Sequence, residues 1–129
     1  MNINVKVEIP RNLPISQLNN YIDYTVNNMA RITLDLTNTQ GGANSHFPED
    51  SGELRRASMG LGVVRNGKNS YYLGAKGTVD YAEIVWDYPQ STNWTNPNTY
   101  AQWYVKEFKK DKELIIKRAV ENAKRGFKL

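Results

Sequence analysis

The stretch from Leu61 to Leu73, LGVVRNGKNSYYL, decides the fold class of this chain. Two apolar runs flank the dipeptide Asn66-Gly67. Asn-Gly between apolar runs is the strongest short-range signal for a β-hairpin, because both central positions of its tight turn need a positive φ. We therefore expect two antiparallel strands joined at Asn66-Gly67. A further strand or mixed segment is expected from Thr78 to Trp86, so the middle of the chain predicts a small antiparallel sheet.

Helical patterns flank this sheet on both sides. From Ile15 to Leu36 apolar residues recur every three or four positions, which is the spacing of one helix face, and Pro14 suits the first turn of such a helix. A broad apolar stripe likewise predicts a C-terminal helix from about Asn98 to Lys124.

Two shorter elements complete the expected order. Apolar and polar residues alternate from Ile3 to Ile9, which predicts a strand, and Ser51 is expected to cap a short helix with Glu53 in its first turn. With 129 residues the chain has the size of one domain. We expect a single α+β domain, residues 1–129, in which two long helices, one N-terminal and one C-terminal, pack against the small antiparallel sheet.

The composition argues against an enzyme. There is no cysteine, so disulfides, thiolate catalysis and cysteine-ligated metals are excluded. The single histidine, His46, lies in a polar loop from Asn38 to Ser51 and has no second histidine with which to share a metal. No phosphate-binding, dinucleotide-binding or EF-hand motif occurs. We expect no catalytic residue, no metal and no cofactor and, because no run of about 20 apolar residues occurs, no membrane partner.

The net charge of +4 is concentrated towards the C-terminal end. Residues 100–129 carry nine Lys and Arg against four Asp and Glu, a surplus of five that exceeds that of the whole chain. Part of this charge is expected in i,i+4 ion pairs, Glu113 with Lys117 and Glu121 with Arg125. A basic helix of this kind can face nucleic acid or an acidic protein partner, and the alternative is an ordinary solvated face.

Nucleic-acid binding is also one interpretation of the cations in the middle of the chain. Basic side chains close to aromatic ones are typical of surfaces that bind single strands, where the rings stack on bases. The residues concerned are Arg55, Arg56, Arg65, Lys68, Tyr71, Tyr72 and Tyr81. The alternative is that the arginines are surface or interface residues and that the tyrosines pack in the sheet.

Large aromatic residues gather in and after a polar loop from Asp87 to Asn98. Aromatic side chains and arginine dominate the energetics of protein–protein interfaces, and their density in so polar a segment predicts a contact with another subunit. The candidate interface residues are Arg55, Arg56, Tyr88, Trp94, Tyr100 and Trp103. Adjacent helix positions cannot both face the core, so at least one of the two arginines is expected to reach an acidic partner. The alternative is that the loop folds back and covers the subunit's own core.

Two motifs carry a resemblance to a known family. The segment Ser51-Gly52-x-Leu54-Arg55-x-x-Ser58, followed by Tyr81-Ala82-x-x-Val85, resembles the neck or tail-completion proteins of tailed bacteriophages. It is most similar to the minor capsid proteins of phages that infect Gram-positive hosts. The similarity covers about residues 45 to 127. After the second motif the chain continues Trp86-Asp87-Tyr88-Pro89, where the family often has Glu, a small residue and Gly.

The resemblance implies a structural virion protein without enzymatic activity or cofactor. Members of the family form rings between portal and tail, so the chain would be a head–tail connector subunit in a ring of six or twelve copies. Its partners would be itself, other neck proteins on the portal and tail-tube sides, and genomic DNA that passes through the channel without sequence-specific contacts. It would lie in the virion neck, and in the host cytoplasm during assembly. The alternative function is a small basic nucleic-acid-binding protein or an RNA-cleaving toxin.

Overall fold

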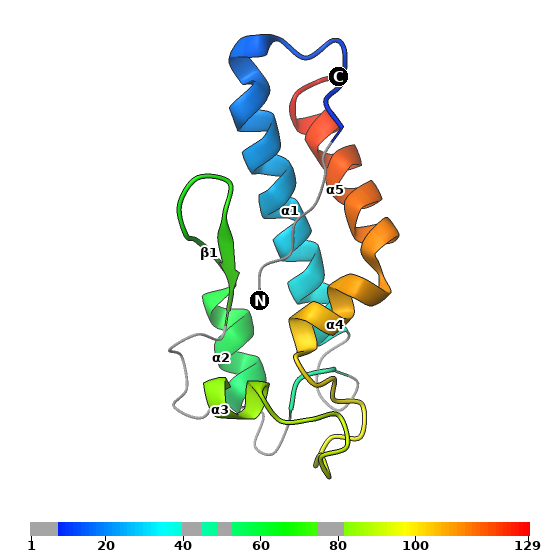
Figure 1. Ribbon diagram of the computed structural model, residues 1–129. Coiled ribbons are helices and arrows are strands. Elements are labelled where there is room, and N and C mark those ends of the chain that lie inside the picture. Colours follow the sequence, from blue (N-terminus) through cyan, green and yellow to red (C-terminus); the bar gives the residue numbers. More distant parts are fainter. Residues whose placement is uncertain (1–7, 40–44, 49–52, 75–81) are drawn as a thin grey trace.

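The computed structural model describes residues 8–39, 45–48, 53–74 and 82–129 (Figure 1). In chain order, the elements are a 3₁₀ turn (Ile15–Gln17), α1 (Leu18–Asn38), α2 (Glu53–Leu61), β1 (Val63–Arg65), β2 (Tyr71–Leu73), α3 (Ala82–Trp86), α4 (Trp103–Lys110) and α5 (Lys112–Gly126). The α+β fold class is confirmed. Among the described residues, no helix is both long and apolar enough to cross a membrane.

Helices α1 and α5 lie side by side and form the long axis of the molecule (Figure 1). Met29 of α1 packs with Ile115 and Ala119 of α5 in one buried cluster, which Phe108 of α4 completes. At the far end Phe127 lies edge-on against Tyr21, with the ring centroids 5.5 Å apart. The C-terminal end of the described chain is therefore packed against the start of α1.

The face of α1 that points inwards is unusually polar for a core helix. Thr25, Thr33 and Thr37 are all buried on it. Their hydroxyl groups donate to the backbone carbonyls of Tyr21, Met29 and Thr33, each four residues earlier, at 2.7–2.8 Å. Because these bonds satisfy the hydroxyls within the helix, the threonines can be buried without a polar partner on a neighbouring element.

The expected single C-terminal helix is wrong, because the structure has two helices that meet at Asp111. The break falls in the run from Lys109 to Leu114, in which no residue is buried, so core packing does not hold the helix straight there. The helical region also begins at Trp103 rather than Asn98, since Gln102 has a left-handed backbone with φ 48° and ψ 57°. The bend lets α4 cover one end of α1 while α5 runs back along it (Figure 1).

The expected hairpin is confirmed, but its turn differs from the expected one. Val63 pairs with Leu73, Val64 with Tyr72 and Arg65 with Tyr71. The Asn66 N–H donates to the Ser70 carbonyl at 2.8 Å, and the positive φ values occur at Gly67 and Asn69. The connection is therefore a wider turn than a two-residue Asn-Gly turn, which would need a positive φ at Asn66.

The further strand expected from Thr78 to Trp86 is wrong for the part that the structure describes, since residues 82–86 form helix α3. A helix places Ala82, Val85 and Trp86 on one face, and all three pack in the main core. The main core is the cluster of buried side chains formed by Leu34, Phe47, Leu54, Ala82, Trp103 and Tyr104. In a strand Val85 and Trp86 would point to opposite faces, so burial of both side chains favours the helix. Residues 78–81 lie outside the described part.

Two further expectations fall at the edge of the described residues. The strand expected from Ile3 to Ile9 is absent at positions 8 and 9, and residues 3–7 lie outside the described part. The expected helix cap, Ser51, also lies outside it, whereas Glu53 does begin α2.

Candidate functional site

The six predicted interface residues range from fully buried to exposed in the structure. Trp103 is only 1% exposed, and its ring lies edge-on against Trp86 with centroids 4.6 Å apart. It packs with Phe47 and Tyr104 in the main core. The prediction that Trp103 contacts another subunit is therefore wrong, because it lies at the start of α4 with its ring turned inwards.

Tyr100 is half-buried and already occupied within the subunit. His46 stacks on its ring with centroids 3.8 Å apart and planes at 5°. The ammonium groups of Lys106 and Lys110 lie 5.1 Å and 5.7 Å from the ring centroid, and Lys110 Nζ donates to the Tyr100 hydroxyl at 3.1 Å. This hydrogen bond raises the pKa of Lys110. These contacts leave Tyr100 poorly placed to bind a neighbouring subunit or to stack on a base.

His46 is held in place as a structural residue. Its Nδ1 lies 2.8 Å from the Asn98 carbonyl, which only accepts, so Nδ1 carries the proton of this bond. No group of three or more His, Asp or Glu residues able to hold a metal ion occurs in the described part of the chain.

The second half of the aromatic loop folds back on the core, as the alternative hypothesis held. The buried Asn96 side chain donates to the carbonyls of Ser45 and Phe47 at 2.8 Å and 3.1 Å. Gln90 donates to the Thr99 carbonyl at 3.0 Å and accepts the Ala101 N–H at 2.8 Å. Neither amide was predicted from the sequence. Asn96 joins segments some fifty residues apart, and together the two side chains fix the base of the loop.

Tyr88 and Trp94 remain at the surface of this loop. Tyr88 is 42% exposed, Trp94 is half-buried, and their ring centroids are 6.2 Å apart. The indole N–H of Trp94 donates to the Gln90 carbonyl at 3.3 Å. The two rings therefore form an aromatic pair, called here the Tyr88–Trp94 pair, on a loop whose base is fixed by hydrogen bonds.

The two arginines of α2 differ in burial, as adjacent positions on a helix require. Arg55 is half-buried and Arg56 is exposed. Of the two, Arg56 is the side chain that is more accessible to a partner.

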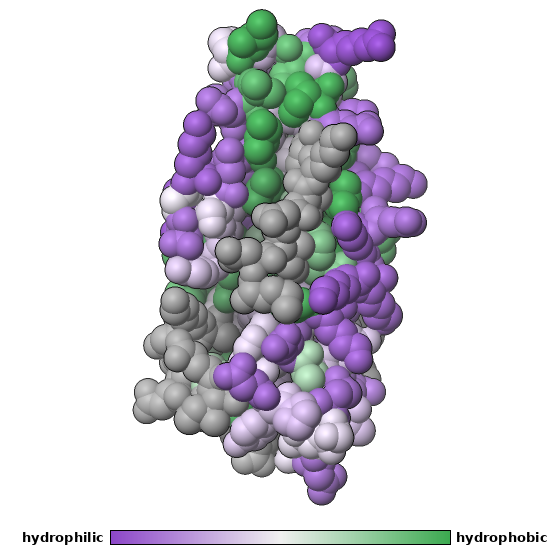
Figure 2. Space-filling model, in the orientation of Figure 1, coloured by the Kyte–Doolittle hydropathy of each residue, from purple (hydrophilic) through white to green (hydrophobic). Residues whose placement is uncertain are grey.

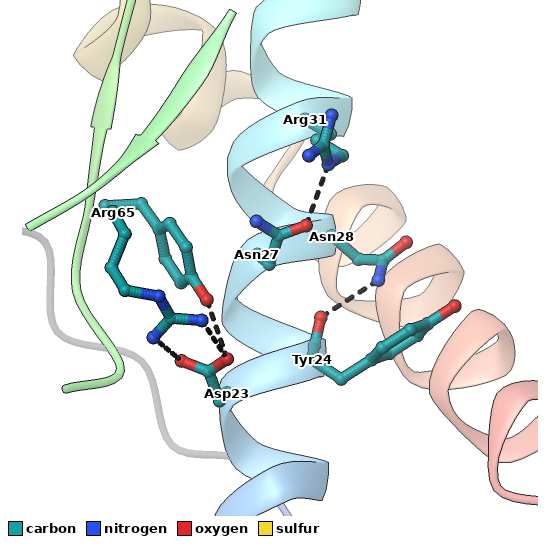
Figure 3. Close-up of polar contacts among 7 residues, drawn as sticks. Asp23, Tyr24, Asn27, Asn28, Arg31 and Arg65 are labelled. Carbon is teal, nitrogen blue, oxygen red and sulfur yellow. Dashed lines mark hydrogen bonds and ion pairs between the residues drawn. The ribbon is translucent and has the colours of Figure 1, made fainter.

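Arg65 of the hairpin reaches Asp23 of α1 (Figure 3), and Tyr71 of the hairpin contacts the same residue. Arg65 forms a bidentate pair with Asp23, at 2.9 Å and 2.7 Å, and the Tyr71 hydroxyl donates to the same carboxylate at 2.7 Å. The hydrogen bond from Arg65 is the main reason that the pKa of Asp23 is lowered. Arg65 and Tyr71 were predicted as part of a nucleic-acid surface, but both polar groups are used within the subunit. The residue missed from the sequence was Asp23.

Glu107 is the one carboxylic acid in the described residues whose pKa is displaced towards neutrality. Its side chain is 2% exposed, and Oε2 has no hydrogen-bond partner among the described residues. Burial, followed by the hydrogen bond and negative charge of Asp111, raises its pKa to about 7, while Lys110 acts in the opposite direction. A buried acid with a raised pKa makes the stability of the fold depend on pH.

The stability of the protein should therefore fall as the pH rises from about 4.5 to about 7. In this range the unfolded chain has released the Glu107 proton while the folded chain still holds it, so each rise in pH favours the unfolded state. Glu107→Gln, which stays neutral, should flatten this dependence and stabilise the fold by about 2 kcal/mol above neutral pH. Urea unfolding at a series of pH values measures it. The exposed Glu113→Gln is the control, and equal pH profiles for wild type and Glu107→Gln would contradict the assignment.

Comparison of the chain with protein-family models, with curated proteins and with solved structures finds no match.

Proposed function

We propose that this chain is a structural assembly subunit, a ring-forming protein of the head–tail connector of a tailed bacteriophage. The resemblance of the Ser51–Ser58 and Tyr81–Val85 motifs to neck proteins supports this function.

The observation that carries the proposal is the Tyr88–Trp94 pair. Interface hot spots are rich in Trp and Tyr, and a contact is stronger when its residues are held in place before binding. Both conditions are met here, because the rings lie at the surface while Asn96 and Gln90 fix the base of their loop. In a cyclic ring this surface would meet a different surface of the adjacent copy, since rings are closed by heterologous contacts.

Loss of the Tyr88–Trp94 pair should block assembly without unfolding the subunit. In a phage genome that encodes this chain, Trp94→Ala and Tyr88→Ala should each give lysates with separate heads and tails. Ile15→Ala, at a side chain that is 91% exposed on the 3₁₀ turn, should give normal particles. Electron microscopy of the lysates and antibody labelling of the particles measure both results. Normal virions from both aromatic variants, or no labelling at the neck, would refute the proposal.

A second candidate function, nucleic-acid binding, is favoured by the exposed lysines and arginines of α4 and α5. Nothing in the described residues favours an RNA-cleaving toxin, since His46 is engaged with Tyr100 and Asn98.

A further inference from the structure

The exposed side of α5 carries a cluster of cations. Hydrophilic side chains project from the edge of the molecule that α5 forms (Figure 2). The cluster, called here the α5 basic face, consists of Lys117, Arg118, Lys124, Arg125 and Lys128, all of which are exposed. The last of them follows the end of the helix. Arg118 and Arg125 are seven residues apart, so they lie in one row along the helix.

The fold makes this surface more basic than the sequence indicates. Of the four acids in residues 100–129, Glu107 is buried with a pKa of about 7 and Asp111 is half-buried. Only Glu113 and Glu121 stand exposed on α5. Their expected ion pairs with Lys117 and Arg125 are not formed. Within the described residues no cation of the α5 basic face lies within 4.0 Å of a carboxylate. The five positive charges are therefore available to a partner.

The chemistry of this face fits a polyanion better than a folded acidic protein. Protein interfaces are centred on buried apolar and aromatic residues with charges at the rim. On α5 the large apolar side chain that is exposed is Leu114, at 38%. The 15 residues of α5 span about 22 Å. Over that length double-stranded DNA presents about 13 phosphate charges, at one per 1.7 Å of its axis.

Of the tyrosines that were candidates for stacking on bases, Tyr71 is engaged within the subunit, and Tyr72 is 41% exposed on the hairpin rather than on α5. The Tyr71 hydroxyl donates to Asp23, and Tyr81 lies outside the described residues. Helix α5 itself carries no aromatic residue on which the bases of a single strand could stack, whereas contact with phosphates needs only exposed cations.

We propose that the α5 basic face binds the phosphate backbone of double-stranded DNA without sequence preference. Its assignment to the DNA in a connector channel rests on the function proposed above, but the contact itself is a property of the free subunit. Binding of this kind releases counterions, so the affinity falls steeply with salt.

The test is fluorescence anisotropy of the full chain with two unrelated duplexes, measured between about 50 and about 200 mM salt. Both duplexes should bind equally. Arg118→Gln combined with Arg125→Gln should reduce the slope of log K against log salt by about 1.8, since each lost phosphate contact accounts for about 0.9. Glu121→Gln, which removes an acid that lies between Lys117 and Lys124 in the sequence, should tighten binding several-fold. Arg11→Gln combined with Arg31→Gln, at exposed positions outside α5, is the control and should leave the slope unchanged.

Three results would overturn the proposal. The first is a slope of log K against log salt that the α5 double variant leaves unchanged, and the second is an equal reduction of that slope by the control pair. The third is binding of polyglutamate as tightly as DNA, which would indicate an acidic protein partner. Thermal melts verify that the variants are folded, as expected for changes at exposed side chains. None of these results bears on the Tyr88–Trp94 experiment, which measures assembly, so the two proposals can fail separately.

Discussion

Trp103→Ala should lower the free energy of unfolding by about 3–5 kcal/mol, whereas Trp94→Ala should lower it by less than about 1 kcal/mol. Trp103 is 1% exposed and packs with Phe47, Tyr104 and Trp86, so its removal leaves a cavity in the main core. Trp94 is half-buried and its ring faces Tyr88 at the surface, so water can fill the space that it leaves.

Urea unfolding of the two purified variants beside wild type measures this difference. Trp103→Phe is a useful third variant, because it keeps an aromatic ring in the core and removes an indole N–H that has no hydrogen-bond partner among the described residues. It should cost clearly less than Trp103→Ala. A similar loss for Trp94→Ala and Trp103→Ala would show that the loop is part of the core, and it would remove the basis for the proposed interface.

Gly74→Ala should destabilise the protein by about 3 kcal/mol, although it adds a single methyl group. A Cβ at this position would lie 2.1 Å from the backbone oxygen of Ser58 and 3.1 Å from that of Gly62. Backbone atoms of α2 and of the residue that follows it cannot rotate away as a side chain would. The methyl group would therefore push β2 away from α2 and strain the 2.9 Å hydrogen bond from the Gly74 N–H to the Gly62 carbonyl.

Gly60→Ala provides the matched control for this change. Gly60 lies in the last turn of α2, and a Cβ there would have nothing within 4 Å. Because alanine favours the helix over glycine, this variant should gain up to about 1 kcal/mol. Thermal unfolding of both variants compares the two effects. If Gly74→Ala is as stable as wild type, the close approach of the strand to α2 does not exist in solution.

The two kinds of predicted surface differ in how well the sequence identified them. The surplus of basic residues in 100–129 is a matter of composition, and the exposed α5 basic face follows from it once the helix is placed. The aromatic cluster is different. Trp94 and Trp103 both lie in or beside a polar loop, and no local pattern distinguishes them. Their separation into surface and core depends on the bonds from Asn96 to Ser45 and Phe47, which join distant segments.

Elements whose signals are local could be predicted from the sequence. The three-or-four spacing from Ile15 to Leu36 predicted α1 within a few residues of its bounds, and Asn66-Gly67 located the hairpin. Both signals depend on residues that are close in sequence. In α1 the spacing places apolar side chains on one face of the helix, and in the hairpin Asn-Gly allows the backbone to turn. The lack of cysteine likewise excludes disulfides whatever the fold, since it is a property of composition alone.

Features that depend on distant contacts could not be predicted in this way, because they arise only when the chain is folded. The break at Asp111 arises because α5 must lie along α1 while α4 covers its end, and the helical form of residues 82–86 arises because Val85 and Trp86 must both reach the core. Asp23, Gly74 and Glu107 are ordinary residues in the sequence. Asp23 acquires its role from its hydrogen bonds with Arg65, Gly74 from its close approach to the backbone of Ser58, and Glu107 from burial beside Asp111. Hydrogen bonds, steric contact and desolvation act between atoms that only the fold brings together.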